Sequence, residues 1–266
     1  MSKNEYYHRY HIQKNFGQHF LINKNLIKKI IDIINPNFNE SFIEIGPGFG
    51  ALTFPLIKRS ESLIAVEIDK NLSNHLLNKL RSKRKVKIIS EDIMKLDLSI
   101  LKNRNSMFRI VGNLPYNIST NLIFYFLSFS GFIIDMHFTF QKELAERLFA
   151  KPNNKSYSRI SVLTQYLYKV VPVIEIDSSS FFPKPKVESL MVKFIPKFPH
   201  RDKSNLEVLR EITKAAFGKR RKMIKNSLKT FFTVKDFEKI DIDPKDRAEN
   251  ISIKKYFKLV QYFKNR

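Results

Sequence analysis

The stretch SFIEIGPGFG, from Ser41 to Gly50, places a short apolar run directly before a turn that holds three glycines. An apolar run bounded by turn residues predicts a buried strand. Glycine lets the chain turn tightly and approach a ligand closely, and in open α/β sheets ligands bind beyond the carboxyl ends of the strands. Gly46, Gly48 and Gly50 are spaced G-x-G-x-G, whereas the spacing expected for NAD is G-x-G-x-x-G. The stretch therefore predicts a strand followed by a ligand-binding turn of another kind.

Outward from this stretch, apolar runs alternate with segments of helical length. The runs lie at 62–68, 86–90, 108–111 and 136–140, and the segments between them include helices predicted from Lys70 and over 141–149. This alternation predicts an α/β fold, a doubly wound, Rossmann-like parallel sheet covered by helices. Farther along, the pattern predicts a helix at 160–168 and strands at 170–176 and 189–196.

The character of the chain changes after Pro196. A polar connector follows, and the remaining sequence has helical periodicity without convincing strands. Residues 197–266 hold 20 Lys and Arg against 9 Asp and Glu. We therefore predict two domains: residues 1–198, with an N-terminal arm at 1–20, and a basic helical domain at 199–266.

The net charge of +23 is large for a soluble enzyme that acts on small molecules. Biased codon usage offers a simple alternative, because the chain is rich in Lys, Asn, Ile and Phe. A polyanion partner, and nucleic acid above all, explains the excess more directly.

Other compositional features limit the class of protein. The chain has no cysteine, which rules out disulfides and thiolate metal ligands and fits a reducing cytoplasm. Its six histidines are scattered, so we expect no metal site. The polar N-terminus predicts no signal peptide, and the longest apolar stretch is interrupted by serines, a glycine and an aspartate. We expect a cytoplasmic protein without a membrane span.

Acidic residues end the two strands that follow the glycine turn. Glu67 closes the second predicted strand, about twenty residues on, where ribose hydroxyls could donate to its carboxylate. Asp92 follows the third, where an adenine amino group could be reached. Each feature alone fits a structural turn or an ordinary strand end. Together they predict a nucleoside-type cofactor.

The fourth predicted strand ends in Asn113-Leu114-Pro115-Tyr116. The exocyclic nitrogen of adenine is a poor nucleophile because its lone pair is delocalised into the ring. The Asn113 side-chain oxygen and the Leu114 carbonyl could accept both of its N–H hydrogens and localise that pair. Pro115 holds Leu114 in an extended conformation, and Tyr116 offers a ring on which an unstacked base could lie. We expect catalysis by orientation, without a general base.

Seven segments in order resemble the KsgA (RsmA) family of small-subunit ribosomal RNA adenine dimethyltransferases, over nearly the whole chain. The segments are FGQHFL (16–21), EIGPGFGALT (44–53), NLPYNIST (113–120), MHFTFQKELAERL (136–148), SRISVLTQY (158–166), FFPKPKVESLMV (181–192) and DRAENIS (246–252). The resemblance implies that the protein uses S-adenosylmethionine. It implies the transfer of two methyl groups to each of two adjacent adenosines near the 3′ end of 16S rRNA in the 30S particle.

The resemblance also implies roles for individual residues. Those at the cofactor would be His19, Leu21, Gly46, Glu67, Asp92 and Asn113. The family commonly has asparagine at the position of His19. A contact of the cofactor with the backbone of His19 is therefore expected, whereas a contact with its side chain does not follow from the resemblance. Phe181 would cover the face of the adenine opposite Tyr116, although the residues alone favour a core position for Phe181 beside Phe182.

Two basic clusters, at 82–87 and 219–229, could position RNA through its phosphates without reading its sequence. Three rivals to this function stay open at this point. One is a large-subunit rRNA methyltransferase, one is an assembly factor that needs little catalysis, and one is an NAD-dependent enzyme that the glycine spacing disfavours. The residues do not reveal the number of methyl groups transferred. The basic surface makes a monomer the expected state.

Overall fold

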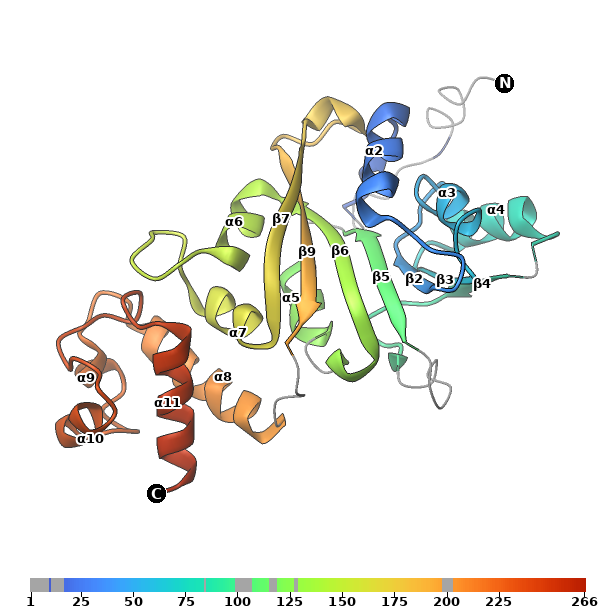
Figure 1. Ribbon diagram of the computed structural model, residues 1–266. Coiled ribbons are helices and arrows are strands. Elements are labelled where there is room, and N and C mark those ends of the chain that lie inside the picture. Colours follow the sequence, from blue (N-terminus) through green and yellow to red (C-terminus); the bar gives the residue numbers. More distant parts are fainter. Residues whose placement is uncertain are drawn as a thin grey trace. The chain divides into compact units, whose positions relative to one another are not determined.

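The computed structural model describes residue 10 and residues 17–83, 85–98, 107–114, 119–126, 129–197 and 203–266 (Figure 1). It divides the chain into two compact units, one of residues 1–145 with 171–195 and one of residues 146–170 with 196–266. The second unit therefore begins well before residue 199 and includes a segment from the middle of the chain. The boundary between the two units follows from which helices and strands pack together, and not from the polar connector near residue 200.

A seven-stranded sheet forms the framework, in the order β4-β3-β2-β5-β6-β9-β7. Its strands are β2 (Ser41–Ile45), β3 (Ser62–Glu67), β4 (Val86–Ser90), β5 (Phe108–Asn113), β6 (Ile133–Gln141), β7 (Tyr168–Ile176) and β9 (Ser189–Pro196). The chain runs outward from β2 to β4 and then returns to β5 on the other side of β2. Ligands in such sheets bind at this reversal, beyond the carboxyl ends of β2 and β5.

The strands from β4 to β6 are parallel, as predicted, but β9 pairs with β6 in the antiparallel direction. The sheet is therefore mixed: the predicted parallel pairing extends from β4 to β6, and β9 adds an antiparallel strand beyond β6. Only residues 177–188 separate β7 from β9, and they hold one 3₁₀ turn (Ser178–Ser180) and β8 (Phe181–Phe182). A parallel connection usually runs through an α-helix, and this twelve-residue segment contains none.

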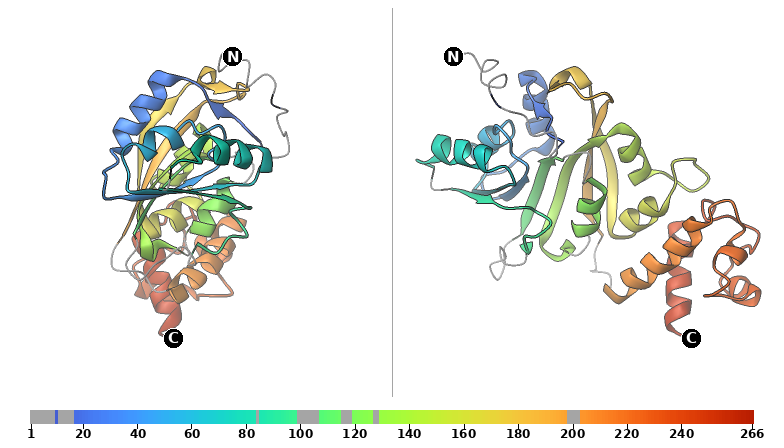
Figure 2. Two further views of the ribbon diagram at one scale, coloured as in Figure 1. Left: turned by 90° about the vertical axis from the view of Figure 1, so that its right-hand side faces the viewer. Right: turned by 180° about the vertical axis from the view of Figure 1, so that it is seen from behind.

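Helices cover both faces of the sheet in the first unit. They are α2 (Lys24–Ile34), α3 (Thr53–Ile57), α4 (Lys70–Leu80) and α5 (Ser119–Phe126). Figure 2 shows α2, α3 and α4 on one face and α5 on the other. The inner face of α2 buries Ile30, Ile31 and Ile34 against residues of β2 and β5. Its N-cap is Asn23, whose side chain accepts a hydrogen bond from the Leu26 N–H at 3.1 Å.

The second unit is helical apart from the first residues of β7. Its helices are the greater part of α6 (Lys142–Phe149), α7 (Arg159–Leu167), α8 (Lys203–Gly218), α9 (Ile224–Ser227), α10 (Val234–Lys239) and α11 (Ile253–Lys264). Two buried tyrosines tie it together: Tyr157 donates to the Ile251 carbonyl at 3.0 Å, and Tyr256 donates to the Ala248 carbonyl at 2.9 Å. Among the described residues no helix is long and apolar enough to span a membrane.

A buried arginine joins the amino ends of three strands to α2. The guanidinium of Arg109, on β5, donates two hydrogen bonds to the Asp135 carboxylate, at 2.8 and 3.0 Å, and one to Glu40 at 2.8 Å. It also donates to the carbonyls of Ile34 and Asn35 at the end of α2. Burial alone would raise the pKa of Asp135, but the hydrogen bonds from Arg109 hold that pKa below its usual value.

We expect Arg109→Met to lower the free energy of unfolding by about 3–5 kcal/mol, because it takes a shared donor away from the buried Asp135 carboxylate and two helix carbonyls. Urea unfolding of the full chain measures the change. The matched control is Arg59→Met, which breaks an exposed ion pair to Asp32 and is expected to cost less than about 1 kcal/mol. Equal effects of the two substitutions would contradict the structural role of Arg109.

Candidate functional site

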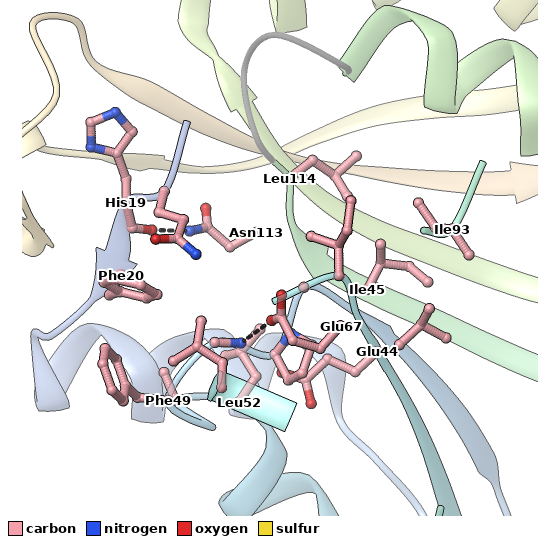
Figure 3. A pocket seen from close by; sticks show the side chains of 18 of the residues that line it. His19, Phe20, Glu44, Ile45, Phe49, Leu52, Glu67, Ile93, Asn113 and Leu114 are labelled. Atoms are coloured by element: carbon pink, nitrogen blue, oxygen red, sulfur yellow. Dashed lines mark hydrogen bonds between the residues drawn. The ribbon is translucent and has the colours of Figure 1, made fainter. Parts of the chain in front are cut away.

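A pocket lies at the carboxyl ends of β2, β3 and β5 (Figure 3). Its lining comes from the segments 17–21, 44–49, 66–68, 91–93 and 113–114, together with Ala51, Leu52 and Leu72. The segments 17–21 and 113–114 are distant in sequence, and β1 (Phe20–Leu21) reaches the pocket by pairing with β8. Six residues predicted at a cofactor, His19, Leu21, Gly46, Glu67, Asp92 and Asn113, all line this pocket.

The glycine turn after β2 forms one wall. Gly46 has φ = 64° and Gly48 has φ = 55°, both in the left-handed region that side chains rarely adopt. A Cβ on Gly48 would lie 2.9 Å from the ring of Phe20, which also lines the pocket. The turn therefore needs glycine both for its backbone conformation and for its close packing on the N-terminal segment.

Glu67 is held by two backbone donors. Its Oε2 accepts a hydrogen bond from the Gly48 N–H and its Oε1 one from the Asp69 N–H, each at 3.0 Å. Burial raises the pKa of Glu67 to about 7, although these two bonds oppose the shift. The carboxylate is thus fixed between β2 and β3, with lone pairs left over for hydroxyl donors of a ligand.

Asp92 lies just beyond β4 and is partly exposed. Its Oδ1 accepts a hydrogen bond from the Met94 N–H at 2.9 Å. The Glu91 N–H donates to the Glu67 carbonyl at 3.1 Å, which ties this turn to the end of β3. The strands β3 and β4 therefore each bring an acidic side chain, Glu67 and Asp92, to the same pocket, and β2 brings a third, Glu44.

Asn113, at the end of β5, has its side chain oriented by the N-terminal segment. Its Nδ2 donates to the His19 carbonyl at 2.7 Å (Figure 3). Because the amide group is planar, this bond turns Oδ1 away from His19 and leaves it as an acceptor. The His19 ring, in contrast, is hydrogen-bonded through Nδ1 to the Pro183 carbonyl at 2.7 Å. It is thus the backbone of His19 that meets Asn113.

Leu114 follows Asn113 in the pocket wall and is 2% exposed. Pro115 and Tyr116, the remaining residues of the motif, lie outside the described residues. Phe181 does not line the pocket: it is 2% exposed and packs in the core cluster that contains Leu21, its partner in the β1–β8 pair. This core position agrees with what the residues alone favour, and the role of Phe181 over the target adenine, implied by the resemblance, stays a prediction.

Glu44, on β2, is a pocket residue that the sequence analysis did not single out. It is 2% exposed, and its Oε2 has no hydrogen-bond partner among the described residues. Burial raises the pKa of Glu44 to about 8 against the opposing hydrogen bonds from Thr53, and the nearby charge of Glu67 adds to the rise. The signal was present, since an acidic residue interrupts an otherwise apolar strand directly before the glycines. The raised pKa of Glu44 thus favours the protonated acid in this pocket.

The described residues contain no group of three or more His, Asp or Glu side chains placed to hold a metal ion. What the pocket offers is a glycine cradle, fixed acceptors at the strand ends and a buried acid with an unsatisfied oxygen. This donor and acceptor set fits a nucleoside with ribose hydroxyls, an amino group and a positively charged portion.

Comparisons with known proteins agree with this geometry. The family model described as ribosomal RNA adenine dimethylase matches residues 9–265. A protein from Wigglesworthia glossinidia brevipalpis, named Ribosomal RNA small subunit methyltransferase A, is 47% identical over 251 residues, which cover 92% of this chain and 95% of that protein.

Two solved structures are similar in fold. A dimethyladenosine transferase from Plasmodium falciparum has a TM-score of 0.81 at 24% identity and covers 92% of this chain and 98% of its own. The 23S rRNA methyltransferase ErmE has a TM-score of 0.71 at 21% identity and covers 92% and 99%. At these identities the likeness concerns the fold alone, and it confirms the predicted Rossmann-like α/β class.

The raised pKa of Glu44 predicts a pH-dependent stability. A carboxyl that stays protonated in the folded chain stabilises it fully below the unfolded pKa of 4.5, and this contribution is lost as the pH rises toward the folded pKa of about 8. Glu44→Gln mimics the protonated acid at every pH. We therefore expect the wild type to lose stability relative to Glu44→Gln between pH 4.5 and 8, by on the order of a few kcal/mol.

Unfolding free energies of both proteins from pH 5 to 8.5 measure this difference. Glu67 is present in both proteins, so its own titration largely cancels. Parallel pH curves would show that Glu44 ionises normally in the folded protein.

Proposed function

This chain belongs to the ribosomal RNA adenine dimethylase family, and from that membership we propose that it dimethylates N6 of two adjacent adenosines near the 3′ end of 16S rRNA in the 30S particle. It is an rRNA adenine dimethyltransferase, and the family and the fold imply S-adenosylmethionine as the methyl donor. Relatives named Ribosomal RNA small subunit methyltransferase A, at 42–47% identity, support the small subunit as the target. We propose a cytoplasmic enzyme that acts as a monomer and has a role in small-subunit biogenesis.

The observation that carries the proposal is the side chain of Asn113. Its Nδ2 is occupied by the His19 carbonyl, so its Oδ1 serves as a hydrogen-bond acceptor in the pocket that also holds Glu67 and the glycine turn. With the Leu114 carbonyl, it would accept the two N–H hydrogens of the target amine and localise the lone pair. A rigid acceptor pair lowers the barrier by orientation, and this requires no basic side chain.

The cofactor would be held by residues at four strand ends. Glu67 would accept from the ribose hydroxyls, Asp92 would accept from the adenine amino group, and Gly46 with Asn113 would contact the methionine portion. The segment from His19 to Leu21 would close over it. When bound, the sulfonium group supplies an electrophilic methyl carbon. The amine would displace the neutral thioether S-adenosylhomocysteine, the S–CH₃ bond breaking as the N–CH₃ bond forms, and the cationic product would lose a proton readily to water.

A second transfer places one further demand on this site. After the first methylation the target nitrogen keeps a single N–H, so one of the two acceptors suffices to orient it. Asn113 is the better candidate for that acceptor, because its orientation is fixed by a hydrogen bond to another segment of the chain. The rate of the second step would then depend on the same side chain as the first.

RNA docking is proposed for the basic helical unit, which we equate in function with the predicted domain at 199–266. Lys219, Arg221 and Lys222 are exposed in the turn between α8 and α9, where phosphates could reach them. Arg220, within the same turn, is engaged with the protein itself, since it donates to Glu249 at 2.7 Å and to the Lys155 carbonyl at 2.7 Å. Part of this basic cluster is therefore structural.

The direct test is incubation with labelled S-adenosylmethionine and undermethylated 30S particles, followed by nucleoside analysis. We expect N6,N6-dimethyladenosine from 30S particles and none from 50S subunits. Asn113→Ala is expected to lower methylation by roughly 10²-fold or more, because it removes an oriented acceptor, while 30S affinity in a filter-binding assay stays within about twofold. Equal losses in both assays would remove Asn113 from the chemistry, and label in 50S subunits would redirect the target.

A second prediction concerns the exposed basic turn. Arg221→Ala combined with Lys222→Ala should weaken 30S binding and make the plot of log affinity against log salt concentration shallower by roughly 1.5, since two phosphate contacts are lost. Arg59→Ala, another exposed arginine, is the control and should leave the slope unchanged. An unchanged slope in the double variant would exclude this turn from the RNA interface.

A further inference from the structure

The one described residue of the chain before Gly17, Tyr10, lies against the wall of the pocket. Its ring makes edge contacts with Phe20 and Phe49, at centroid distances of 6.0 and 5.2 Å. Phe20 and Phe49 contact each other at 4.6 Å, and both line the pocket. Tyr10 thus contacts both members of an aromatic pair that lines the ligand pocket.

The hydroxyl of Tyr10 is anchored separately from its ring. It donates a hydrogen bond to Oδ2 of Asp69, which also accepts from Nε2 of Gln18 at 3.1 Å. Burial, and then the Asp69 carboxylate, raise the pKa of the Tyr10 hydroxyl above its usual value, so the hydroxyl keeps its proton and remains a donor. Two residues of the N-terminal segment therefore converge on one oxygen of Asp69.

Asp69 connects Tyr10 to Glu67, a residue that lines the pocket. Its other oxygen, Oδ1, accepts from the N–H groups of Asn71 and Leu72 and so caps α4. Its own N–H donates to Glu67, whose second oxygen accepts from the turn at Gly48. A continuous series of hydrogen bonds thus runs from the N-terminal segment through Asp69 to the carboxylate proposed to hold the ribose.

We propose that Tyr10 is a positioning residue for cofactor binding: through its hydrogen bond to Asp69 and its ring contacts it holds Phe20, Phe49 and Glu67 in their binding arrangement. This rests on the proposed function, since the ligand concerned is S-adenosylmethionine. If that arrangement is the one that binds, the apparent affinity scales with the fraction of molecules that adopt it. Loss of the hydroxyl reduces that fraction even though Tyr10 is not among the residues that line the pocket.

The test is Tyr10→Phe, which deletes the hydroxyl and keeps the ring contacts. The probe is S-adenosylhomocysteine, titrated calorimetrically into the full chain. We expect its Kd to rise roughly five- to tenfold, the size of one typical lost intramolecular hydrogen bond. The KM for S-adenosylmethionine with undermethylated 30S particles should rise in parallel while kcat stays within about twofold, because binding and not chemistry is changed.

The chain provides a matched control in Tyr262, whose hydroxyl donates to Oδ1 of Asp236 at 2.7 Å in the helical unit. Tyr262→Phe removes the same kind of bond and is expected to leave the Kd unchanged. Asp69→Asn keeps an oxygen to cap α4 but removes the charge. In that background Tyr10→Phe should change the Kd by less than about twofold, since the two residues act through one interaction.

Three outcomes would overturn the proposal: an unchanged Kd in Tyr10→Phe, an equal rise in Tyr262→Phe, or a full additional loss in the Asp69→Asn background. A fall in kcat with an unchanged KM would also overturn it, because it would assign Tyr10 to the chemical step. Failure of the wild-type chain to bind S-adenosylhomocysteine and to methylate 30S particles would instead reject the proposed function, and this proposal with it.

Discussion

The carboxylate of Glu67 is the interaction on which the rest of the site depends. It accepts one hydrogen bond from the N–H of Gly48, in the turn that follows β2, and one from the N–H of Asp69, the N-cap residue of α4. The carboxyl ends of two neighbouring parallel strands are thereby held by a single side chain, although the backbone there has left the sheet. Buried N–H groups need a hydrogen-bond acceptor, and here the Glu67 carboxylate is that acceptor, where within the sheet it would be the carbonyl of a neighbouring strand. The ligand pocket is the space that this arrangement keeps open.

The two ends of the sheet hold buried ionisable side chains in different ways. At the amino ends, Arg109 forms ion pairs with Asp135 and Glu40, so that each of these charges has a close partner. Its guanidinium also donates a hydrogen bond to the Ile34 carbonyl at the end of α2. At the carboxyl ends, Glu44 is buried with an oxygen that has no partner among the described residues. An unpaired buried acid lowers stability, and such groups gather at functional sites. The paired cluster stabilises the fold that carries the unpaired acid.

Segments distant in the chain meet at the pocket because β1 pairs with β8 and brings the N-terminal segment to the ends of β2 and β5. The His19 carbonyl then orients Asn113, and the hydroxyl of Tyr10 meets Asp69. The segment that covers the cofactor space therefore also aligns the acceptor proposed for the target amine. In the proposed function, cofactor binding and target orientation would share this one structural element, which would couple the placement of the two substrates.

The sequence by itself determined the strands from β2 to β6 and the residues at their ends, Gly46, Glu67, Asp92 and Asn113. These follow from local patterns, since apolar runs predict strands, turn residues bound them, and the carboxyl ends of parallel strands meet at one edge. The tertiary structure decided the remainder. The antiparallel direction of β9, the unpartnered oxygen of Glu44 and the membership of residues 146–170 in the helical unit all depend on which surfaces pack together. The contacts of Asn113 with His19 and of Tyr10 with Asp69 span 94 and 59 positions of the chain. No local pattern encodes such contacts, because the geometry of the whole fold sets them.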